Sequence, residues 1–296
     1  MNQSSTKTQA IEHVLTFDAE DWHQGFVHRG ISGWEQVGSS ERATIDRILR
    51  ILDEHDTKAT FFVLGKFAEA HPALVKLIYA QGHEIASHSY AHVPISVLGI
   101  DGFRNDLEQS TDVIQQVTGE RVRGYRAPFF SMTTHTLWAY EILAGSGFQY
   151  DSSVFPTRIH RYGSPSSLPH PHRVQLKSGA SILEFPAQVL RIGPVRMPAA
   201  GGFYLRAFPL VFSQWALSQA ARKGHVGMVY LHPYDLEPQV PLLKTSLQFR
   251  VIRYYNLDKT QHVLGALLQR FRFGAVRDLI GEFGRTFPSY TYPGNP

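Results

Sequence analysis

The regular part of the chain opens with HVLTF (13–17), ERATIDRILRILDEH (41–55) and KATFFVLG (58–65), which alternate between strand and helix patterns. The two short apolar runs predict buried strands, and the spacing of Ile45, Ile48 and Leu52 predicts a helix with one buried face. A strand, a helix and a second strand in this order form the repeating unit of a parallel sheet. The stretch therefore predicts an α/β fold.

The alternation continues along the chain, with the expected elements as follows: helix 66–82, strand 83–89, helix 101–119, strand 122–128, helix 134–144, strands 148–153 and 182–189, helix 209–222 and strand 226–233. About seven such units favour a distorted (β/α) barrel over residues 13–235. We expect a disordered segment at 1–12 and a C-terminal helical extension, 236–296, packed on the barrel. Clustered prolines predict that residues 156–202 form long loops around one or two strands.

The amino-acid composition limits which catalytic and metal-binding groups the protein can use. The 296 residues include 29 basic, 25 acidic and 15 histidine side chains, and no cysteine. Disulfides, thiol nucleophiles and cysteine-bound zinc are thereby excluded, so any metal must be held by His, Asp or Glu. A net charge of +4 without clustered Lys and Arg does not indicate a nucleic-acid partner.

The N-terminus gives an expectation about location. It is polar (MNQSSTKTQAIEH, 1–13) and lacks the apolar core of a signal peptide, and no run is long enough for a transmembrane helix. We therefore expect a cytoplasmic protein, and peripheral contact with a membrane surface stays open as an alternative.

Charged and polar groups follow the predicted strands. Asp18, Glu20 and Asp21 come at the end of the first strand, and three carboxylates this close repel one another unless a cation lies among them. His88 and His92, after the third strand, have the i, i+4 spacing of two metal ligands. Taken singly, the carboxylates could also be a solvated loop or a helix cap, and two histidines four residues apart are more often accidental than not.

Three later strands end in the same way. Arg126 precedes a Pro-stiffened turn, Asp151 ends the strand 148–153, and His232 follows the last strand. A surface arginine, an Asx turn and a capping histidine are the ordinary explanations. In a barrel, however, the carboxyl ends of all the strands meet at one mouth. Five polar motifs at five strand ends therefore predict a single active site.

The motifs and their order resemble the polysaccharide deacetylase family, which includes metal-dependent chitin and peptidoglycan deacetylases. The resemblance rests on LTFD (15–18), ATFFVLG (59–65), QGHEIASHSYAH (81–92), RAPFF (126–130), YDSS (150–153) and LHP (231–233). Within the family, the chain resembles an exosortase-associated branch found in exopolysaccharide gene clusters. That second resemblance rests on DAEDWH (18–23), EFP (184–186), GGFYLRAFP (201–209) and the tail 254–276.

The resemblance implies that His88 and His92 are metal ligands. Typical members carry two adjacent aspartates, of which the first is a base and the second a ligand. Here Ala19 follows Asp18, so the third ligand is Glu20 or Asp21. The period-2 geometry of a continuing strand favours Glu20, whereas a turn beginning there favours Asp21, which we slightly prefer.

The resemblance assigns the remaining roles as well. Asp18 is the general base, Arg126 orients it, and His232 is the general acid. The backbone N–H of Phe129 belongs to the oxyanion hole, and Asp151 matches a position that elsewhere in the family positions the acid histidine.

These roles imply a metal-dependent hydrolase that removes N-acetyl groups from the amino sugars of a polysaccharide or its precursor, in exopolysaccharide biosynthesis. The implied cofactor is a divalent metal, Zn²⁺ first and Co²⁺ or Ni²⁺ as substitutes. Two alternatives stay open: a metal-dependent amidohydrolase acting on a small amide, and a catalytically silent glycan-binding protein.

Overall fold

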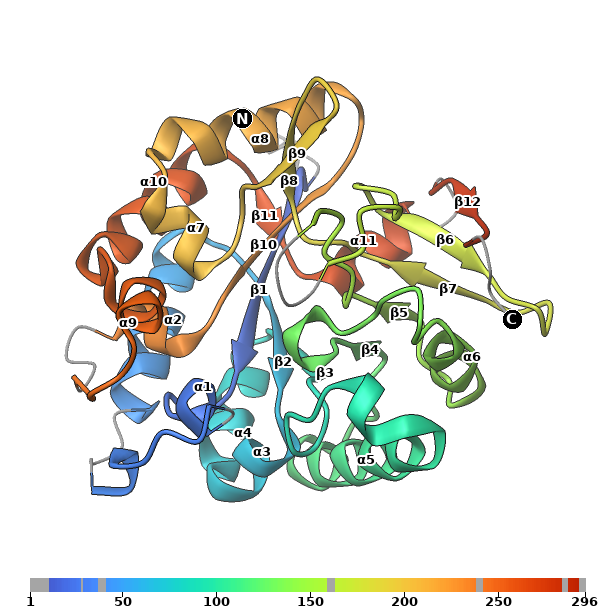
Figure 1. The fold of residues 1–296 in the computed structure, drawn as a ribbon, viewed down its shortest axis with the longest axis horizontal. Helices are drawn as coiled ribbons and strands as arrows, with labels where there is room; N and C mark the ends of the chain where they lie inside the picture. Colours follow the sequence, from blue (N-terminus) through green and yellow to red (C-terminus); the bar gives the residue numbers. More distant parts are fainter. Residues whose placement is uncertain are drawn as a thin grey trace, which may run out of the picture.

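The computed structural model describes residues 11–27, 29–36, 41–158, 163–237, 242–283 and 287–292 (Figure 1). The expected disordered segment at 1–12 thus lies almost entirely outside the described residues. One large sheet runs through the molecule with the strand order β10-β1-β2-β3-β4-β5-β7-β6-β12, and β11 pairs with β1. From β10 to β7 every neighbouring pair is parallel, which confirms the predicted α/β fold.

The strands are β1 (His13–Ala19), β2 (Thr60–Val63), β3 (Glu84–Ser87), β4 (Gly124–Tyr125), β5 (Tyr150–Asp151), β6 (His172–Gln175), β7 (Ser181–Glu184), β8 (Val189–Ile192), β9 (Val195–Pro198), β10 (Gly227–Leu231), β11 (Phe273–Gly274) and β12 (Ser289–Tyr290). The α-helices are α1 (Gln24–Val27), α2 (Glu41–Glu54), α3 (Gly65–Ala70), α4 (Pro72–Ala80), α5 (Ile95–Thr118), α6 (Trp138–Gly145), α7 (Gly202–Ala207), α8 (Leu210–Arg222), α9 (Leu247–Tyr254), α10 (Thr260–Arg270) and α11 (Val276–Phe283). Four short 3₁₀ helices complete the description: η1 (Trp34–Gln36), η2 (Pro128–Phe130), η3 (Pro233–Leu236) and η4 (Leu257–Lys259).

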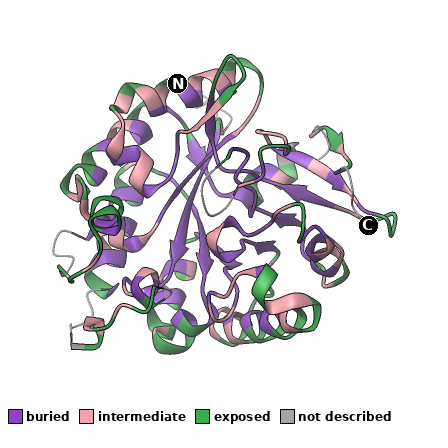
Figure 2. Ribbon diagram, viewed as in Figure 1, coloured by how far each residue is buried: buried purple, intermediate pink, exposed green. Residues whose placement is uncertain are grey.

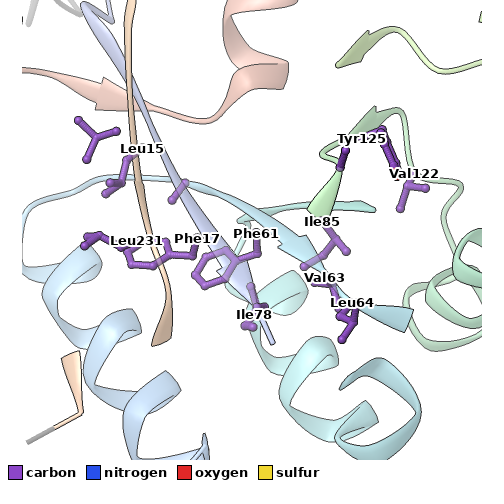
Figure 3. Packing of buried hydrophobic residues seen from close by; sticks show 14 of the residues in the cluster. Leu15, Phe17, Phe61, Val63, Leu64, Ile78, Ile85, Val122, Tyr125 and Leu231 are labelled. Carbon is purple, nitrogen blue, oxygen red and sulfur yellow. The ribbon is translucent and has the colours of Figure 1, made fainter. Parts of the chain in front are cut away.

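Both faces of the sheet are buried, and the period-2 geometry of the strands divides the core between them. Phe17, Phe61 and Leu231 belong to the cluster under the helices (Figure 3), whereas their neighbours Phe62 and Tyr230 belong to a second cluster on the opposite face. Figure 2 shows the central strands buried and the exposed residues on the surrounding helices and loops. Continuous burial of this kind is typical of parallel strands covered on both faces.

Two predicted helices differ from expectation for local reasons. The helix expected at 66–82 is divided at His71, because Pro72 starts α4 as its first residue and ends α3 before it. The helix expected at 101–119 begins earlier, at Ile95, and contains a break at Gly99, whose φ of +66° suits glycine alone.

The proline-rich segment is more regular than predicted. Residues 156–202 contain β6 and β7, an antiparallel pair in the main sheet, and the separate hairpin β8–β9. The prediction of one or two strands was therefore wrong. The prolines in this segment fall mostly outside the strands or at their ends, where a missing N–H costs no ladder bond.

The tail beyond residue 236 contains the predicted helices, α9, α10 and α11, and two short strands that the sequence did not indicate. The first of these, β11, pairs with the beginning of β1, and β12 pairs with β6. The tail therefore completes the main sheet as well as packing on it. No helix in the described part of the chain is long and apolar enough to cross a membrane.

Candidate active site

The register of the parallel strands brings the predicted residues together. Phe17 of β1 lies beside Leu231 of β10, so that Asp18 and His232 are the next residues on two neighbouring strands. Ser87 of β3 lies beside Tyr125 of β4, so His88 and Arg126 follow in the same way. The side chains therefore converge at one end of the sheet, as predicted.

Glu20, His88 and His92 form a compact cluster of possible metal ligands. One ligand atom from each lies within 4.8 Å of the others, and all three side chains are buried. The Nδ1 atom of His88 donates to the carbonyl oxygen of Arg126 at 2.8 Å, which leaves Nε2 with its lone pair available. His92 Nε2 lies 2.8 Å from Glu20 Oε2.

The charge states of this cluster suit a cation. Burial lowers the pKa of His88 to about 4, so its imidazole is neutral near pH 7. Burial opposes ionisation of Glu20, but the nearby His92, His232 and His88 outweigh it and lower the pKa of Glu20 to about 2. Neutral imidazole and ionised carboxylate are the forms in which these groups bind a metal. The donor set therefore fits a His₂-carboxylate site.

The structure separates the two carboxylates that the sequence left as alternatives. Glu20 directly follows β1, and its carboxylate lies on the same side as that of Asp18, since His232 Nε2 is 4.0 Å from an oxygen of each. This is the placement that period-2 geometry favours. Asp21 turns away and its Oδ1 lies 3.0 Å from Nε2 of His71, whose pKa this hydrogen bond raises. The geometry thus supports Glu20 as the third ligand and does not support the preference for Asp21.

Asp18 is held by a fully buried arginine. Arg126 Nη1 donates to Asp18 Oδ1 at 2.5 Å and to Thr16 Oγ1 at 2.9 Å. Its Nη2 and Nε atoms donate to the Oγ and carbonyl oxygen of Ser152, and its guanidinium lies 4.0 Å from the centre of the Phe62 ring. One guanidinium nitrogen donates to Asp18 and the other two donate to Ser152, so the Arg126–Asp18 contact is single rather than bidentate. The second carboxylate oxygen of Asp18, Oδ2, is therefore not bound by Arg126.

His232 faces both carboxylates. Its Nε2 lies 4.0 Å from Asp18 Oδ2 and 4.0 Å from Glu20 Oε1, and its Nδ1 lies 3.2 Å from Asp235 Oδ2. Burial alone would lower the pKa of His232, but the hydrogen bond and charge of Asp235, with smaller contributions from Glu20 and Asp18, raise it overall. A raised pKa favours the protonated form, which is the form that a general acid requires.

The loops around the cluster are conformationally unusual. Ser89, His92, Phe129 and Phe130 all have positive φ values, between +49° and +72°, although none is glycine. Such conformations cost free energy and cluster at functional sites. The rings of Phe129 and His92 lie 4.7 Å apart, so the side chain of Phe129 contacts a candidate ligand. The oxyanion hole that the resemblance implies for the backbone N–H of Phe129 stays a prediction.

Asp151 does not lie beside His232. Its carboxyl accepts from the hydroxyl and backbone N–H of Ser153, and it shares a hydrogen bond with the carboxyl group of Glu184. Burial raises the pKa of Asp151 to about 6, and burial together with the charge of Asp151 raises the pKa of Glu184 well above its ordinary value. The contacts of Asp151 are thus with Ser153 and Glu184, and the carboxylate beside His232 is that of Asp235.

Sequence reasoning missed Asp235 and Ser152. A signal for Asp235 was present, because His232-Pro233-Tyr-Asp235 has the pattern of a capping box, in which residue N3 reaches back to the N-cap. Ser152 was inside a quoted motif, but nothing in its residue type indicated that it would hold Arg126.

Two family models match the chain. The model of polysaccharide deacetylases matches residues 6–145, which contain Asp18, Glu20, both site histidines of the third strand end and Arg126. The chain carries a polysaccharide deacetylase family domain. The model of a domain of unknown function, DUF3473, matches residues 152–281, which contain His232 and Asp235. The residues of the candidate site thus come from both matched regions, 6–145 and 152–281.

Curated relatives match about a third of the chain. The chain is 34% identical over 96 residues to a peptidoglycan-N-acetylglucosamine deacetylase of Bacillus cereus, covering 32% of this chain and 35% of that protein. It is 33% identical over 100 residues to a chitooligosaccharide deacetylase of Sinorhizobium fredii, covering 33% of this chain and 44% of the relative. The matched stretches thus span about a third to a half of these relatives.

Solved structures share the fold over nearly the whole chain. A structure titled as a putative polysaccharide deacetylase from Mycobacterium smegmatis has a TM-score of 0.64 at 22% identity and covers 96% of both chains. An allantoinase has a TM-score of 0.61 at 16% identity, covering 94% of this chain and 92% of that one. The fold shared with the Mycobacterium smegmatis structure therefore extends through the DUF3473 region. The allantoinase has the same fold.

Proposed function

We propose that this protein removes acetyl groups from acetamido sugars of a glycan, releasing acetate and leaving a free amine. One observation carries the proposal: a buried Glu20–His88–His92 cluster lies beside an Asp18 fixed by Arg126 and a His232 that is 4.0 Å from Asp18. A ligand set, a base and an acid at one strand edge are the groups that amide hydrolysis needs. The names of the matched deacetylases agree with this reaction.

The cluster would hold a divalent cation, with Zn²⁺ as the best match to two imidazoles and one carboxylate. When bound, such a cation lowers the pKa of a bound water to about 7 and polarises a carbonyl group. The ion pair of Asp18 and Arg126 needs no rearrangement during the reaction. Arg126 is fully buried, and each of its three guanidinium nitrogens donates a hydrogen bond.

The proton steps follow from the positions of Asp18 and His232. Asp18 Oδ2, the oxygen that Arg126 leaves available, accepts the proton of the attacking water. His232 Nε2 donates a proton to the amine as the carbon–nitrogen bond breaks, so that a neutral amine departs. The backbone N–H of Phe129 donates to the oxygen on which negative charge develops.

An exopolysaccharide, or its acetylated precursor, is our choice of glycan. The choice rests on the motifs that the chain shares with the exosortase-associated branch, among them GGFYLRAFP (201–209) and the tail 254–276. This choice is more specific than the reaction type, and acetate release from a chitooligosaccharide tests the reaction type alone.

The experiment measures acetate release from an acetylated chitooligosaccharide by protein stripped of metal and then reloaded with Zn²⁺, Co²⁺ or Ni²⁺. We expect release only after reloading. Allantoin serves as the small-amide substrate, and glycan binding by calorimetry detects a silent binder. Turnover of allantoin with an inert glycan, or binding without release by any metal form, would overturn the proposal.

A further inference from the structure

We infer that the DUF3473 region acts as a clamp on the general acid: α7 and α9 fix the imidazole of His232 through Asp235 and Arg206. The inference rests on the proposed function, and it assigns two positioning residues, Asp235 and Arg206, that touch neither substrate nor the reacting atoms. It also gives a role to residues 201–237 and 242–255.

Asp235 sets the orientation of the acid. Its Oδ2 accepts from the backbone N–H of His232 at 3.0 Å and lies 3.2 Å from Nδ1 of the same residue. Asp235 is ionised, since Arg206 and His232 together lower its pKa well below the usual range despite burial. An ionised carboxylate only accepts, so Nδ1 must carry the proton and Nε2 must face Asp18.

Arg206 holds Asp235 from behind. Its Nη1 donates to Asp235 Oδ1, its Nε donates to the carbonyl oxygen of Tyr255 at 2.8 Å, and its Nη2 donates to that of Ile252 at 2.8 Å. These carbonyl groups belong to the last turn of α9 and the residue after it, where a cation is favourable. Arg206 therefore ties the end of α9 to the carboxylate that orients the acid.

Two glycines allow this close approach. Gly202 starts α7 against Asp235, and a Cβ added there would lie 2.0 Å from Asp235 Oδ2. Gly201 has a φ of +145°, and a Cβ there would lie 2.4 Å from the ring of Tyr230. The glycine pair is thus required by the packing of α7 on the strand end that carries His232.

A second route from α9 reaches the ring itself. Arg253 of α9 donates to the carbonyl oxygen of Trp22 at 2.5 Å, and its guanidinium lies 3.4 Å from the centre of the Tyr234 ring. Tyr234 stacks on His232, with ring centres 4.6 Å apart and planes within 13°. Asp235 thus fixes one edge of the imidazole while Tyr234, pressed by α9, fixes one face.

The first test needs no variant. In ¹⁵N-histidine-labelled protein, with His232→Gln used to assign the signal, we expect Nδ1 of His232 to be protonated in the neutral ring as well as in the cationic ring. Its N–H proton should exchange slowly and resonate strongly downfield. Metal-free protein should show the same signal. A neutral ring protonated on Nε2 would overturn the clamp.

The second test uses leaving groups. An acetamido sugar needs a proton on its departing amine, whereas para-nitrophenyl acetate releases a stable phenolate without one. Asp235→Asn should lower kcat for the glycan by about 10²-fold, with KM and bound Zn²⁺ unchanged and ester hydrolysis within about twofold. Arg206→Lys, which keeps the charge but not the fork, should have a smaller effect in the same direction.

Matched controls separate positioning from folding. The control for Arg206→Lys is Arg222→Lys, which changes an exposed arginine at the end of α8. The control for Gly202→Ala is Gly145→Ala, whose added Cβ meets nothing within 4 Å, whereas a Cβ at Gly202 would lie 2.0 Å from Asp235 Oδ2. We expect both controls to match the wild type. Equal losses on glycan and ester in stable Asp235→Asn and Arg206→Lys proteins would overturn the inference. If wild-type protein releases no acetate at all, the proposed function fails, while the labelled-histidine measurement still decides the clamp.

Discussion

Asp18 and His232, the residues proposed as general base and general acid, are supported by different kinds of structure. Asp18 is held by one fully buried arginine on a neighbouring strand end, inside the part of the chain that the deacetylase model matches. His232 keeps 20% of its side chain exposed and is supported in layers by Asp235, Tyr234 and two helices of the DUF3473 region. Asp18 is thus fixed by one buried side chain from a neighbouring strand end, whereas His232, which is partly exposed, is held by several additional elements.

The largest expected effect is on the candidate metal cluster of Glu20, His88 and His92. Glu20→Gln should lower metal affinity by more than about 100-fold and abolish deacetylation, since it removes a ligand that lies among two histidines. Asp21→Asn is the matched change one residue away and should bind metal normally, because Asp21 pairs with His71. Metal content by elemental analysis checks both variants, and loss of metal in Asp21→Asn alone would reverse the ligand assignment.

The next prediction compares the two proton-transfer residues directly. Asp18→Asn and His232→Ala should each lower kcat by about 10²–10⁴-fold and leave bound metal in place. Asp18→Asn should also slow hydrolysis of an activated ester, because the base is needed for any leaving group, whereas His232→Ala should slow the amide alone. Stopped assays with both substrates measure this difference. Identical profiles for the two variants would contradict the assigned roles.

A smaller effect concerns the carboxyl pair below the site. The pKa of Asp151 is about 6 in the folded protein and 3.8 in its ordinary state, so the folded protein binds the extra proton between these values. The associated stability is full below about pH 3.8 and is lost as the pH rises through about 6. Relative to Asp151→Asn, the wild-type free energy of unfolding should therefore fall by about 2 kcal/mol between pH 4 and pH 7. Urea unfolding at several pH values gives the two curves, and parallel curves would show that Asp151 is an ordinary carboxylate.

The smallest prediction tests a single donor in the same network. Tyr140 donates to Glu184 Oε2 at 2.9 Å, and Tyr140→Phe leaves that buried oxygen without this partner. We expect a loss of about 1–2 kcal/mol in the free energy of unfolding. Tyr290→Phe is the control, because its hydroxyl makes a long, exposed contact of 3.5 Å with the carbonyl oxygen of Ser166. Losing that contact should change stability by less than about 0.5 kcal/mol. Equal losses would show that the buried network contributes nothing special.

The sequence predicted the surroundings of Asp18 better than those of His232. Strand periodicity and the order of motifs were enough to place Asp18, His88 and Arg126 together, because a parallel register fixes where strand ends meet. The choice between Glu20 and Asp21 depended on where β1 ends, and strand boundaries are the least certain part of a sequence pattern. Asp235 and Arg206 are 29 residues apart and meet only through tertiary packing, so no local period marks them.

The pairing of β1 has a consequence for how the protein is made. His13 at its start lies beside Gly227 of β10, 214 residues later, and beside Phe273 of β11, which comes later still. At ribosomal rates of about 5–20 residues per second, β1 waits roughly 10–40 s after emerging before β10 exists to pair with it. Throughout that time an apolar strand edge is open to other chains. Nascent-chain chaperones should therefore engage this protein at its N-terminal strand, and slower translation of the second half should lower the yield of folded protein.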